Sequence, residues 1–339
     1  MRFGLIGYGL WGRHVATAIG AAPGATLAAI ACASETTAAA AARDFPGVPV
    51  DLGYQALLAR PDIDAVAVVV PNHLHAEVGV AALEAGKDVL MEKPMATTLD
   101  GCDRLLAAAR TNGRVLTVGH QLRLSAQYGQ VKALIDAGEI GVPVYVSFTL
   151  FRFPFRPGSQ GWRYDPARIG SWLLEETVHF FDFVMWYFDG IGDPRSVLAR
   201  GDTEPRGAGL SDNVTVLLRF PGQAHAVISQ TLAAFECHQN LHVVGTEGAI
   251  RSWWSGAQDR TPHPAFELRL ERRPKRVVET VPVDQSGEVV ELTAQMREVV
   301  TAFARRRPLL SGEEARKSIV VCLAAEQSLR ENREITLRF

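Results

Sequence analysis

The first third of the chain alternates between two patterns of hydrophobic residues. Short aliphatic and β-branched runs, which are typical of buried strands, alternate with alanine-rich stretches of helical length. This order predicts repeated β-α-β units and therefore a doubly wound parallel sheet of the α/β class. The expected strands are Phe3–Ile6, Leu27–Cys32, Ala65–Val70, Asp88–Met91 and Val115–Val118, and the expected helices are Trp11–Ala21, Thr36–Asp44, Tyr54–Ala59, His75–Ala85 and Leu99–Thr111.

The period of the pattern changes after about Gln121. Apolar and polar side chains then alternate residue by residue, as in Val144–Phe151 and Val214–Phe220, which is typical of antiparallel strands buried on one face. We therefore expect two domains, residues 1–121 with the parallel sheet and residues 122–339 as an α/β domain with a largely antiparallel sheet. Its other expected elements are the strands Ala224–Thr231, Leu241–Val244, Phe266–Leu270 and Val277–Val281 and the helices Ser171–Phe188, Glu291–Arg305 and Glu313–Arg330.

Composition and charge exclude two classes of partner. The 339 residues are 47% hydrophobic, which suffices for two cores of ordinary size. The 35 Lys and Arg residues balance 37 Asp and Glu residues, so a basic surface that gathers nucleic acid is not expected. The longest aliphatic run, Ala65–Val70, is far shorter than the ~20 residues that cross a bilayer, so a membrane partner is not expected either.

The cysteines and the start of the chain indicate the compartment. The four cysteines include no Cys-x-x-Cys pair, and no cluster of side chains has metal-ligand spacing, so neither a disulfide framework nor a metal is expected. The chain enters a glycine-rich fold motif by Gly7, where a signal peptide would have an apolar stretch. We therefore expect a cytoplasmic protein.

Gly7, Gly9 and Gly12 form a G-x-G-x-x-G motif between the first expected strand and the first expected helix. In a dinucleotide site, the first glycine permits a tight turn, the second lets the backbone approach the pyrophosphate, and the third lets helix and strand pack closely. The helix start, here Leu10 and Trp11, presents backbone N–H groups that favour phosphate. The motif predicts a Rossmann domain that binds NAD or NADP.

The end of the second expected strand leaves both cofactors open. An acid about 20 residues beyond the glycines usually binds the ribose hydroxyls of NAD, but Ala33 stands at that position. Ser34 and Thr36 have hydroxyl groups that suit a 2′-phosphate, whereas Glu35 would repel one. Ser34 is the expected contact in either case.

Further motifs make the chain resemble the glucose-fructose oxidoreductase, inositol dehydrogenase and MocA (Gfo/Idh/MocA) family. Pro71-Asn72-His73-Leu74-His75 ends one strand and Glu92-Lys93-Pro94 follows the next. The resemblance covers essentially the whole chain, because later motifs occur in the expected order at Gly119–Arg123, Gly138–Gly141 and His179–Asp182. It implies a Rossmann domain, a second domain with a largely antiparallel sheet, and hydride transfer between NAD(P) and a sugar or cyclitol carbon.

The resemblance also implies which residues react. Lys93 corresponds to the active-site lysine of the family, and His179 to a histidine whose partner is an acid four residues earlier, here Glu175. The commoner family pattern has Asp at that position and Gly two residues before the histidine, where this chain has Thr177. Glu176 therefore remains an alternative support for His179.

Alcohol oxidation has its own chemical requirements. The hydroxyl proton leaves together with the hydride, so a group that titrates near neutrality is needed at the oxygen, and His179 suits that role. The ammonium of Lys93, at the end of a strand, would stabilise a developing alkoxide. The two roles are interchangeable between these residues. Without the resemblance, a buried core histidine and a solvated lysine would be equally acceptable interpretations.

Other candidate contacts follow from the same motifs. Asn72 is placed at the nicotinamide ribose, although it could instead cap the following helix and His75 could be a helix-entry residue. Sugars offer hydroxyls around weakly apolar rings, so polar groups beside aromatic faces should bind the substrate. The remaining expected cofactor contacts are Pro71, His75, Glu92 and Lys93, and the expected substrate contacts are Gln121, Arg123, Trp162, Arg163 and Glu176.

Two other readings of the sequence compete with a dehydrogenase. A regulatory protein that senses NAD(P) without turnover would keep the fold, but it is expected to lose the lysine or the histidine, and this chain has both. A methyltransferase with a similar glycine-rich loop is disfavoured by Glu92-Lys93-Pro94. The alternation along Tyr145–Phe151 also predicts an exposed apolar sheet face, which favours a homodimer or homotetramer.

Overall fold

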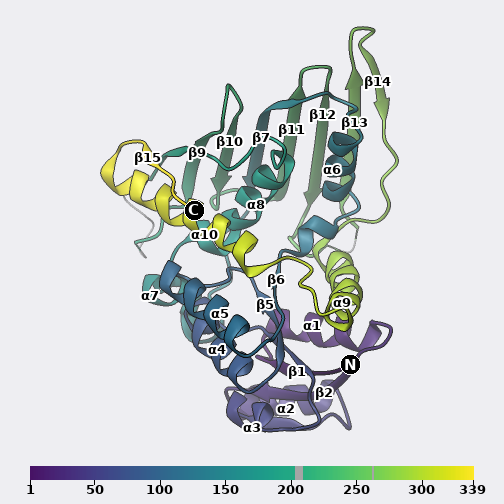
Figure 1. Ribbon diagram of the computed structural model, residues 1–339, viewed down its shortest axis with the longest axis vertical. Coiled ribbons are helices and arrows are strands. Elements are labelled where there is room, and N and C mark those ends of the chain that lie inside the picture. Colours follow the sequence, from purple (N-terminus) through teal and green to yellow (C-terminus); the bar gives the residue numbers. More distant parts are fainter. Residues whose placement is uncertain (203–208, 262) are drawn as a thin grey trace. The chain divides into compact units, whose positions relative to one another are not determined.

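The computed structural model describes residues 1–202, 209–261 and 263–339. Contacts within these residues divide the chain into two compact units, whose elements are labelled in Figure 1. The first unit contains Met1–Gln121, Ala167–Gly170 and Leu292–Ile319. The second contains Leu122–Pro166, Ser171–Glu291 and Val320–Phe339.

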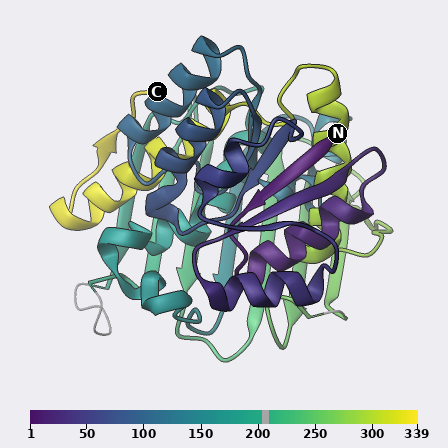
Figure 2. The ribbon, with the colours of Figure 1, turned by 90° about the horizontal axis from the view of Figure 1, so that it is seen from below.

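The first unit contains the parallel sheet that the alternating pattern predicts. Its six strands lie in the order β3-β2-β1-β4-β5-β6, and Figure 2 shows them from below between two layers of helices. The direction of the strand order reverses between β1 and β4, which is where open α/β sheets bind ligands at their carboxyl ends. The strands are β1 Arg2–Ile6, β2 Thr26–Cys32, β3 Val50–Leu52, β4 Ala65–Val68, β5 Asp88–Glu92 and β6 Leu116–Gly119.

Helices cover both faces of this sheet. On one face, α4 contacts both α3 and α5, and on the other face α1 and α2 share a core with the strands. Apolar residues at helical spacing direct each helix onto the sheet, as Val15 and Ile19 do in α1. The helices are α1 Leu10–Ala21, α2 Glu35–Asp44, α3 Tyr54–Leu58, α4 His75–Glu84 and α5 Leu99–Thr111.

A late helix completes the core of the first unit. Helix α9, Glu288–Ala304, buries Leu292, Met296, Val299 and Phe303 in one stripe, and the Phe303 ring stacks on Phe3 of β1 with centroids 6.2 Å apart. The predicted domain boundary after residue 121 assigns this stretch to the second domain, whereas residues 292–319 pack with the first unit. The spacing of apolar residues in the sequence predicts which face of a helix is buried. It does not predict which of the two sheets covers that face.

Among its described residues, the second unit has a nine-stranded sheet in the order β14-β13-β12-β11-β7-β10-β9-β8-β15, in which β10 and β7 run parallel to one another and the other neighbouring strands are antiparallel. This confirms the predicted, largely antiparallel sheet. The strands are β7 Pro143–Phe151, β8 Ser196–Gly201, β9 Asn213–Arg219, β10 His225–Thr231, β11 Cys237–Gly245, β12 Gly248–Gly256, β13 Ala265–Arg272, β14 Val277–Thr280 and β15 Ile335–Thr336.

Helices α6, Tyr128–Asp136, and α8, Val178–Tyr187, lie on one face of this sheet (Figure 1). Their core is aromatic: the Phe148 ring of β7 stacks on Phe180 at 4.1 Å, and Tyr128 lies 5.0 Å from Phe183. Between them in sequence lies α7, Pro166–Ile169, and the chain ends with α10, Gly312–Glu331.

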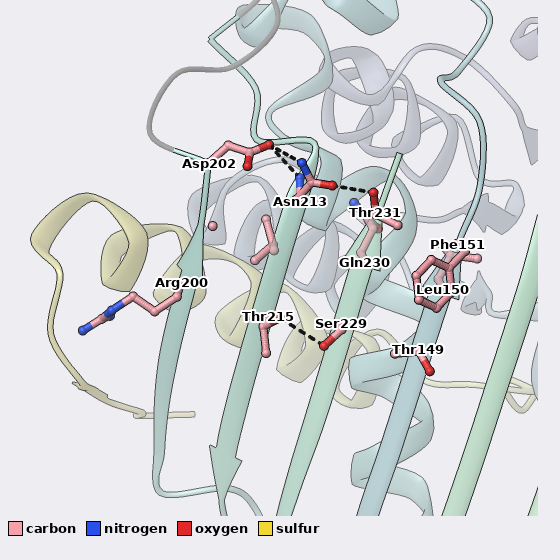
Figure 3. A pocket seen from close by; sticks show the side chains of 12 residues that line it. Thr149, Leu150, Phe151, Arg200, Asp202, Asn213, Thr215, Ser229, Gln230 and Thr231 are labelled. Carbon is pink, nitrogen blue, oxygen red and sulfur yellow. Dashed lines mark hydrogen bonds between the residues drawn. The ribbon is translucent and has the colours of Figure 1, made fainter. Parts of the chain in front are cut away.

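The opposite side of β7 is more polar than predicted. Its outward positions alternate as Tyr145, Ser147, Thr149 and Phe151, and the neighbouring strands contribute hydroxyl groups that bond each other, as Thr215 and Ser229 do at 3.1 Å. A pocket of about 380 Å³ on these strands includes the hydroxyl side chains of Thr149, Thr215, Ser229 and Thr231 in its lining (Figure 3). This part of the face therefore mixes hydroxyl groups with exposed apolar groups such as Phe151, which is 42% exposed.

Candidate active site

The glycine loop follows β1 and opens α1. Gly7 has φ +103°, and a Cβ there would lie 2.1 Å from the Val69 carbonyl oxygen. A Cβ on Gly12 would lie 2.1 Å from the Gly7 carbonyl oxygen, so both positions exclude any side chain. A Cβ on Gly9 would meet nothing within 4 Å, and Gly9 directly precedes the first turn of α1. The loop thus leaves open space at the helix amides of the kind that a pyrophosphate fills.

The ribose end of this region is built around a helix cap. Ser34 is the N-cap of α2: its Oγ accepts a hydrogen bond from the Thr37 backbone at 3.3 Å and lies 3.0 Å from the Thr37 hydroxyl. Glu35 is exposed in the first turn. Arg13 and Arg43 both pair with Asp44, at 2.7 and 3.2 Å. A carboxylate is therefore exposed next to Ser34, and these two nearby cations are engaged elsewhere.

Lys93 directly follows the buried strand β5 and is half-buried. Its neighbour Pro94 is held by His75, which is 1% exposed. The His75 ring nitrogens lie 2.5 Å from the Pro94 carbonyl oxygen and 2.9 Å from that of Val70. His75 thus connects the segments that follow β4 and β5, so it holds the Glu92-Lys93-Pro94 segment in place. Glu92 itself is buried, as the last residue of β5.

Asn72 does not cap the following helix. It begins a short 3₁₀ turn, Asn72–Leu74, after Pro71, and neither that turn nor α4 has a side-chain cap. Its side-chain amide donates a hydrogen bond to the Ile169 carbonyl oxygen at 3.1 Å, within the first unit. The capping alternative is therefore wrong, and the buried Asn72 connects the β4 segment to residues 167–170.

In the second unit, the helix predicted at Ser171–Phe188 contains a π-helical turn. The π segment spans Leu173–Thr177, and α8 begins at Val178, whose N–H donates to the Leu173 carbonyl oxygen. Such turns insert an extra residue into the helix and shift the side chains before them around its axis. The spacing of four residues between Glu175 and His179 therefore does not place them as a regular α-helix would.

Glu175 lies with two other predicted site residues. Its Oε1 accepts a hydrogen bond from Nε of Arg163 at 2.8 Å, and the Arg163 guanidinium lies 4.5 Å from the ring centroid of Trp162. The structure therefore brings Glu175, Arg163 and Trp162 together as one cluster.

Glu176 has a different partner. Its Oε2 lies 3.3 Å from Nη1 of Arg152, and Nη2 of the same arginine donates to Asp259 at 3.1 Å. The Arg152 guanidinium also lies 3.8 Å from the centroid of the Phe155 ring, and its side chain is 5% exposed. Arg152 therefore holds two carboxylates from distant parts of the chain.

His179 and Glu176 line one small cavity. His179 is 5% exposed. The cavity has a volume of about 20 Å³, and sequence reasoning anticipated only these two of its residues. Of the others, Leu122 lies within the Gly119–Arg123 motif, and the rest come from segments that carry no motif. They are Tyr128, Cys237, Gln239, Trp254, Asp259, Ser286, Gly287, Glu288 and Glu291.

Arg123, a predicted substrate contact, forms an ion pair within the second unit. Its Nε and Nη2 donate to the two carboxylate oxygens of Asp182 at 2.7 and 2.8 Å, and the guanidinium lies 5.1 Å from the Trp186 ring. Both partners lie on α8, so Arg123 fixes the helix that carries His179. Gln121, the last residue of the first unit's opening segment, is 3% exposed.

The described residues contain neither a group of metal ligands nor a helix that could span a bilayer. In residues 1–202, 209–261 and 263–339, no three His, Cys, Asp or Glu side chains are grouped as metal ligands. Within the same ranges, no helix is both long and apolar enough to span a bilayer.

The sheet order and the glycine loop define the class of the protein as a dinucleotide-binding enzyme of the Rossmann type, with a second unit based on a mostly antiparallel sheet. Residues 1–120 match the family model described as "Oxidoreductase family, NAD-binding Rossmann fold", and residues 128–251 match the "GFO/IDH/MocA C-terminal domain". The chain belongs to the Gfo/Idh/MocA family of oxidoreductases, and its cofactor is NAD or NADP.

Named relatives agree with this assignment. The 1,5-anhydro-D-fructose reductase of Ensifer adhaerens is 34% identical over 74% of this chain and 74% of its own length. The inositol 2-dehydrogenase of Acidothermus cellulolyticus is 30% identical over 74% of this chain and 72% of its own length. The fold matches that of levoglucosan dehydrogenase, solved in complex with NADH and L-sorbose, with a TM-score of 0.86 at 23% identity, over 100% of this chain and 99% of that one.

Proposed function

We propose that the protein transfers a hydride between NAD(P) and a secondary alcohol or ketone of a sugar, a cyclitol or a related polyhydroxylated compound. The observation that carries the proposal is the glycine loop at the switch point of the parallel sheet, together with Lys93 at the end of β5, which lies two strands from β1 in the sheet order. The relatives support the substrate class, since those with assigned names include a sugar reductase and inositol dehydrogenases.

The residues of the first unit fit the cofactor. The open space beside Gly9 admits a pyrophosphate at the amides of Leu10 and Trp11, and Gly7 and Gly12 keep the loop close to the sheet. Pro71, Asn72 and Glu92 belong to the segments at the same edge of the sheet and are the proposed contacts toward the nicotinamide end. When bound, NAD(P) supplies the hydride acceptor for oxidation or the hydride donor for reduction.

Lys93 and His179 are the proposed catalytic pair. In the oxidative direction, His179 takes the proton that the hydroxyl loses, and the Lys93 ammonium stabilises the negative charge that develops on the oxygen. In the reductive direction, His179 returns that proton. The ring of His179 is nearly buried, so water competes weakly for the proton.

Charged pairs behind these residues act as positioning residues. Arg123 and Asp182 fix α8, and Arg163 holds Glu175 within the π turn that precedes His179. Gln121 and Trp162 remain proposed substrate contacts, together with Glu176, which shares a cavity with His179. His75 acts on Lys93 through the Pro94 carbonyl.

The test is a comparison of Lys93→Ala and His179→Ala with the wild type. Each enzyme is mixed with NAD or NADP and a panel of sugars and cyclitols, and the nicotinamide absorbance is followed in both directions. We expect either substitution to lower kcat/KM by about 10²–10⁴-fold, the usual effect of a proton-transfer group. The affinity for NAD(P), measured by fluorescence titration, should stay within about tenfold because both residues act on the transition state.

Lys275→Ala is the matched control, because Lys275 lies in the exposed turn between β13 and β14. A Lys93→Ala enzyme with a near-normal rate would refute the assigned role. If the wild type binds NAD(P) and turns over no member of a broad panel, the protein is a dinucleotide sensor.

We also propose that the protein forms a homodimer or homotetramer. The second unit exposes large apolar side chains: Phe235 is 88% exposed and Phe151, at the end of β7, is 42% exposed. Apolar groups of this size on a surface favour association. Light scattering coupled to size-exclusion chromatography should give a multiple of the 36.9 kDa chain mass, and a monomer at all concentrations contradicts the proposal.

We place the protein in the cytoplasm, where thiols remain reduced. Its four cysteines are free and buried, and burial raises the pKa of both Cys102 and Cys237 to about 12. Fractionation of producing cells tests this placement, and recovery of the protein outside the cytoplasmic fraction contradicts it.

A further inference from the structure

The small cavity beside His179 is unusually acidic. Four of its lining residues carry carboxyl groups, namely Glu176, Asp259, Glu288 and Glu291. No lysine or arginine is among the lining residues within the part of the chain that the structure describes. Among the described residues, the lining therefore offers four carboxyl groups and no guanidinium or ammonium group to a bound molecule.

Two arginines lie behind these carboxylates. Arg152 pairs with Glu176 and Asp259, and Arg260 pairs with Glu288 at 3.4 Å. Two guanidinium groups thus oppose four carboxyl groups, which leaves an excess of negative charge when all four are ionised. Charges buried in this way act strongly on a bound group, because little water screens them.

Glu291 shows that the cavity has an unused hydrogen-bonding capacity. The residue is 2% exposed, and its Oε1 accepts hydrogen bonds from the Ser286 hydroxyl at 2.9 Å and the Gly287 backbone at 3.3 Å. Its buried Oε2 has no hydrogen-bond partner among the described residues. A buried carboxyl oxygen without a donor is costly, and a bound hydroxyl or ammonium group would supply that donor.

The protonation state of the cavity suits a hydroxyl group at neutral pH. Burial, together with Glu176 and Asp259, raises the pKa of Glu288 to about 7 against the opposing effect of Arg260 and Arg152. Burial raises the pKa of Glu291 to about 7 against the hydrogen bonds from Ser125, Ser286 and Gly287. Protonated carboxyls donate to a hydroxyl and ionised ones accept from it, so the same cavity satisfies both sides of an OH group.

The size of the cavity limits what it takes. A volume of about 20 Å³ is close to that of one water-sized group, since ~10–15 Å³ suffices for a water molecule. Trp254, which is 5% exposed, supplies an aromatic surface at its wall, of the kind that packs on the apolar face of a sugar ring. A single ring substituent fits this space better than a whole ring.

We propose that this cavity is a selecting subsite of the dehydrogenase, which accepts a hydroxyl or ammonium substituent next to the reacting carbon and rejects a carboxylate or phosphate. The inference rests on the proposed function, because it places the reacting carbon at His179. Anionic substituents would face Glu176, Asp259 and Glu288, and no lysine or arginine among the described residues of the wall would offset their charge. The substrate class is therefore neutral and amino polyols, and sugar acids and sugar phosphates are excluded.

The experiment uses ligands that share one ring. D-glucose, D-glucosamine, D-glucuronate and D-glucose 6-phosphate are compared with the wild type and with Glu288→Gln, by turnover with NAD(P) and by calorimetric binding in the presence of NAD(P)H. Glu288 is chosen because its side chain is 26% exposed and its loss leaves Arg152 paired. Glu247→Gln, in an exposed turn of the same unit, is the matched control.

We expect the wild type to prefer glucose and glucosamine over glucuronate and the phosphate by at least tenfold. In Glu288→Gln, the ratio of activity with the neutral and amino sugars to activity with the anionic sugars should be at least threefold smaller than in Glu247→Gln. The affinity for NAD(P) should be unchanged. Asp259→Asn is a second variant with the same expectation, should Glu288→Gln fail to fold.

Three outcomes overturn the proposal. They are a wild-type preference for the anionic sugars, an equal preference in Glu288→Gln and Glu247→Gln, and an absence of binding and turnover for all four ligands. If the neutral sugars bind selectively and none reacts, the proposed function fails while the selecting subsite stands.

Discussion

Glu291→Gln should stabilise the protein above pH 7 and leave its stability nearly unchanged near pH 4.5. Glu291 is 2% exposed, and burial raises its pKa from the usual 4.5 to about 7. Below pH 4.5 the carboxyl is protonated in both the folded and the unfolded chain. Between pH 4.5 and 7 the unfolded chain loses the proton while the folded chain keeps it, so ionisation favours unfolding as the pH rises.

The magnitude follows from the size of the pKa difference. Each pKa unit corresponds to about 1.36 kcal/mol, so a rise from 4.5 to about 7 destabilises the wild type by about 3 kcal/mol at pH 8 relative to pH 4.5. Glutamine cannot ionise, and its Oε1 can still accept from Ser286 and Gly287. Glu288 titrates over the same range in both proteins, so its contribution cancels in the difference.

Urea unfolding followed by circular dichroism, at pH 5 and pH 8, measures the difference between variant and wild type. We expect the free energy of unfolding of Glu291→Gln to exceed that of the wild type by about 3 kcal/mol at pH 8 and by less than about 1 kcal/mol at pH 5. Glu247→Gln, at an exposed position, should show no such trend. A difference that is equal at the two pH values refutes the burial argument.

Three other substitutions test the first unit. Gly9→Ala should fold normally, because its Cβ meets open space, but it should weaken NAD(P) binding at least tenfold. Gly12→Ala should instead lower the free energy of unfolding by about 1–3 kcal/mol, because its Cβ clashes with the Gly7 carbonyl oxygen. Fluorescence titration and urea unfolding distinguish these effects, and equal behaviour of the two variants contradicts them. The wild type should prefer NAD, because Glu35 would repel the 2′-phosphate of NADP. Glu35→Arg removes that repulsive charge and should raise the ratio of kcat/KM with NADP to kcat/KM with NAD about tenfold, or by about 1.4 kcal/mol. An unchanged ratio means that Glu35 is far from the 2′ position. His75→Ala leaves two carbonyl oxygens without their ring partner and should cost about 2–4 kcal/mol in unfolding free energy together with a fall in kcat, and a stable, fully active variant contradicts its positioning role.

The strands and helices of the first unit were largely predictable, because each carries its own periodicity. The predicted helix Leu99–Thr111 is found unchanged, and β1 starts only one residue earlier than expected. Strand β3 was missed since its three residues are too short to form a pattern. In the second unit β8 was also missed, and its sequence Ser-Val-Leu-Ala-Arg-Gly lacks a clear alternation of apolar and polar residues.

In the candidate site, too, the local motifs were predictable and the contacts between distant segments were not. The glycine loop and the Glu92-Lys93-Pro94 segment are local motifs, so the sequence alone identifies them. Arg152 and Asp259 are 107 residues apart, and their pairing depends on how β7 and the segment after β12 lie in the sheet. The ion pair of Glu175 with Arg163 was not predictable either, because no residue pattern signals the π turn in which Glu175 lies.

The return of α9 to the first unit has a consequence for the order in which the protein acquires its shape on the ribosome. Phe3 is synthesised early, yet its ring partner Phe303 emerges 300 residues later. At a synthesis rate of ~5–20 residues per second, at least about 15 seconds pass before α9 is available to cover the apolar surface of the first unit that it buries. A nascent chain halted before Leu292 should therefore be a good client of chaperones, and a fragment ending at Gln121 should aggregate.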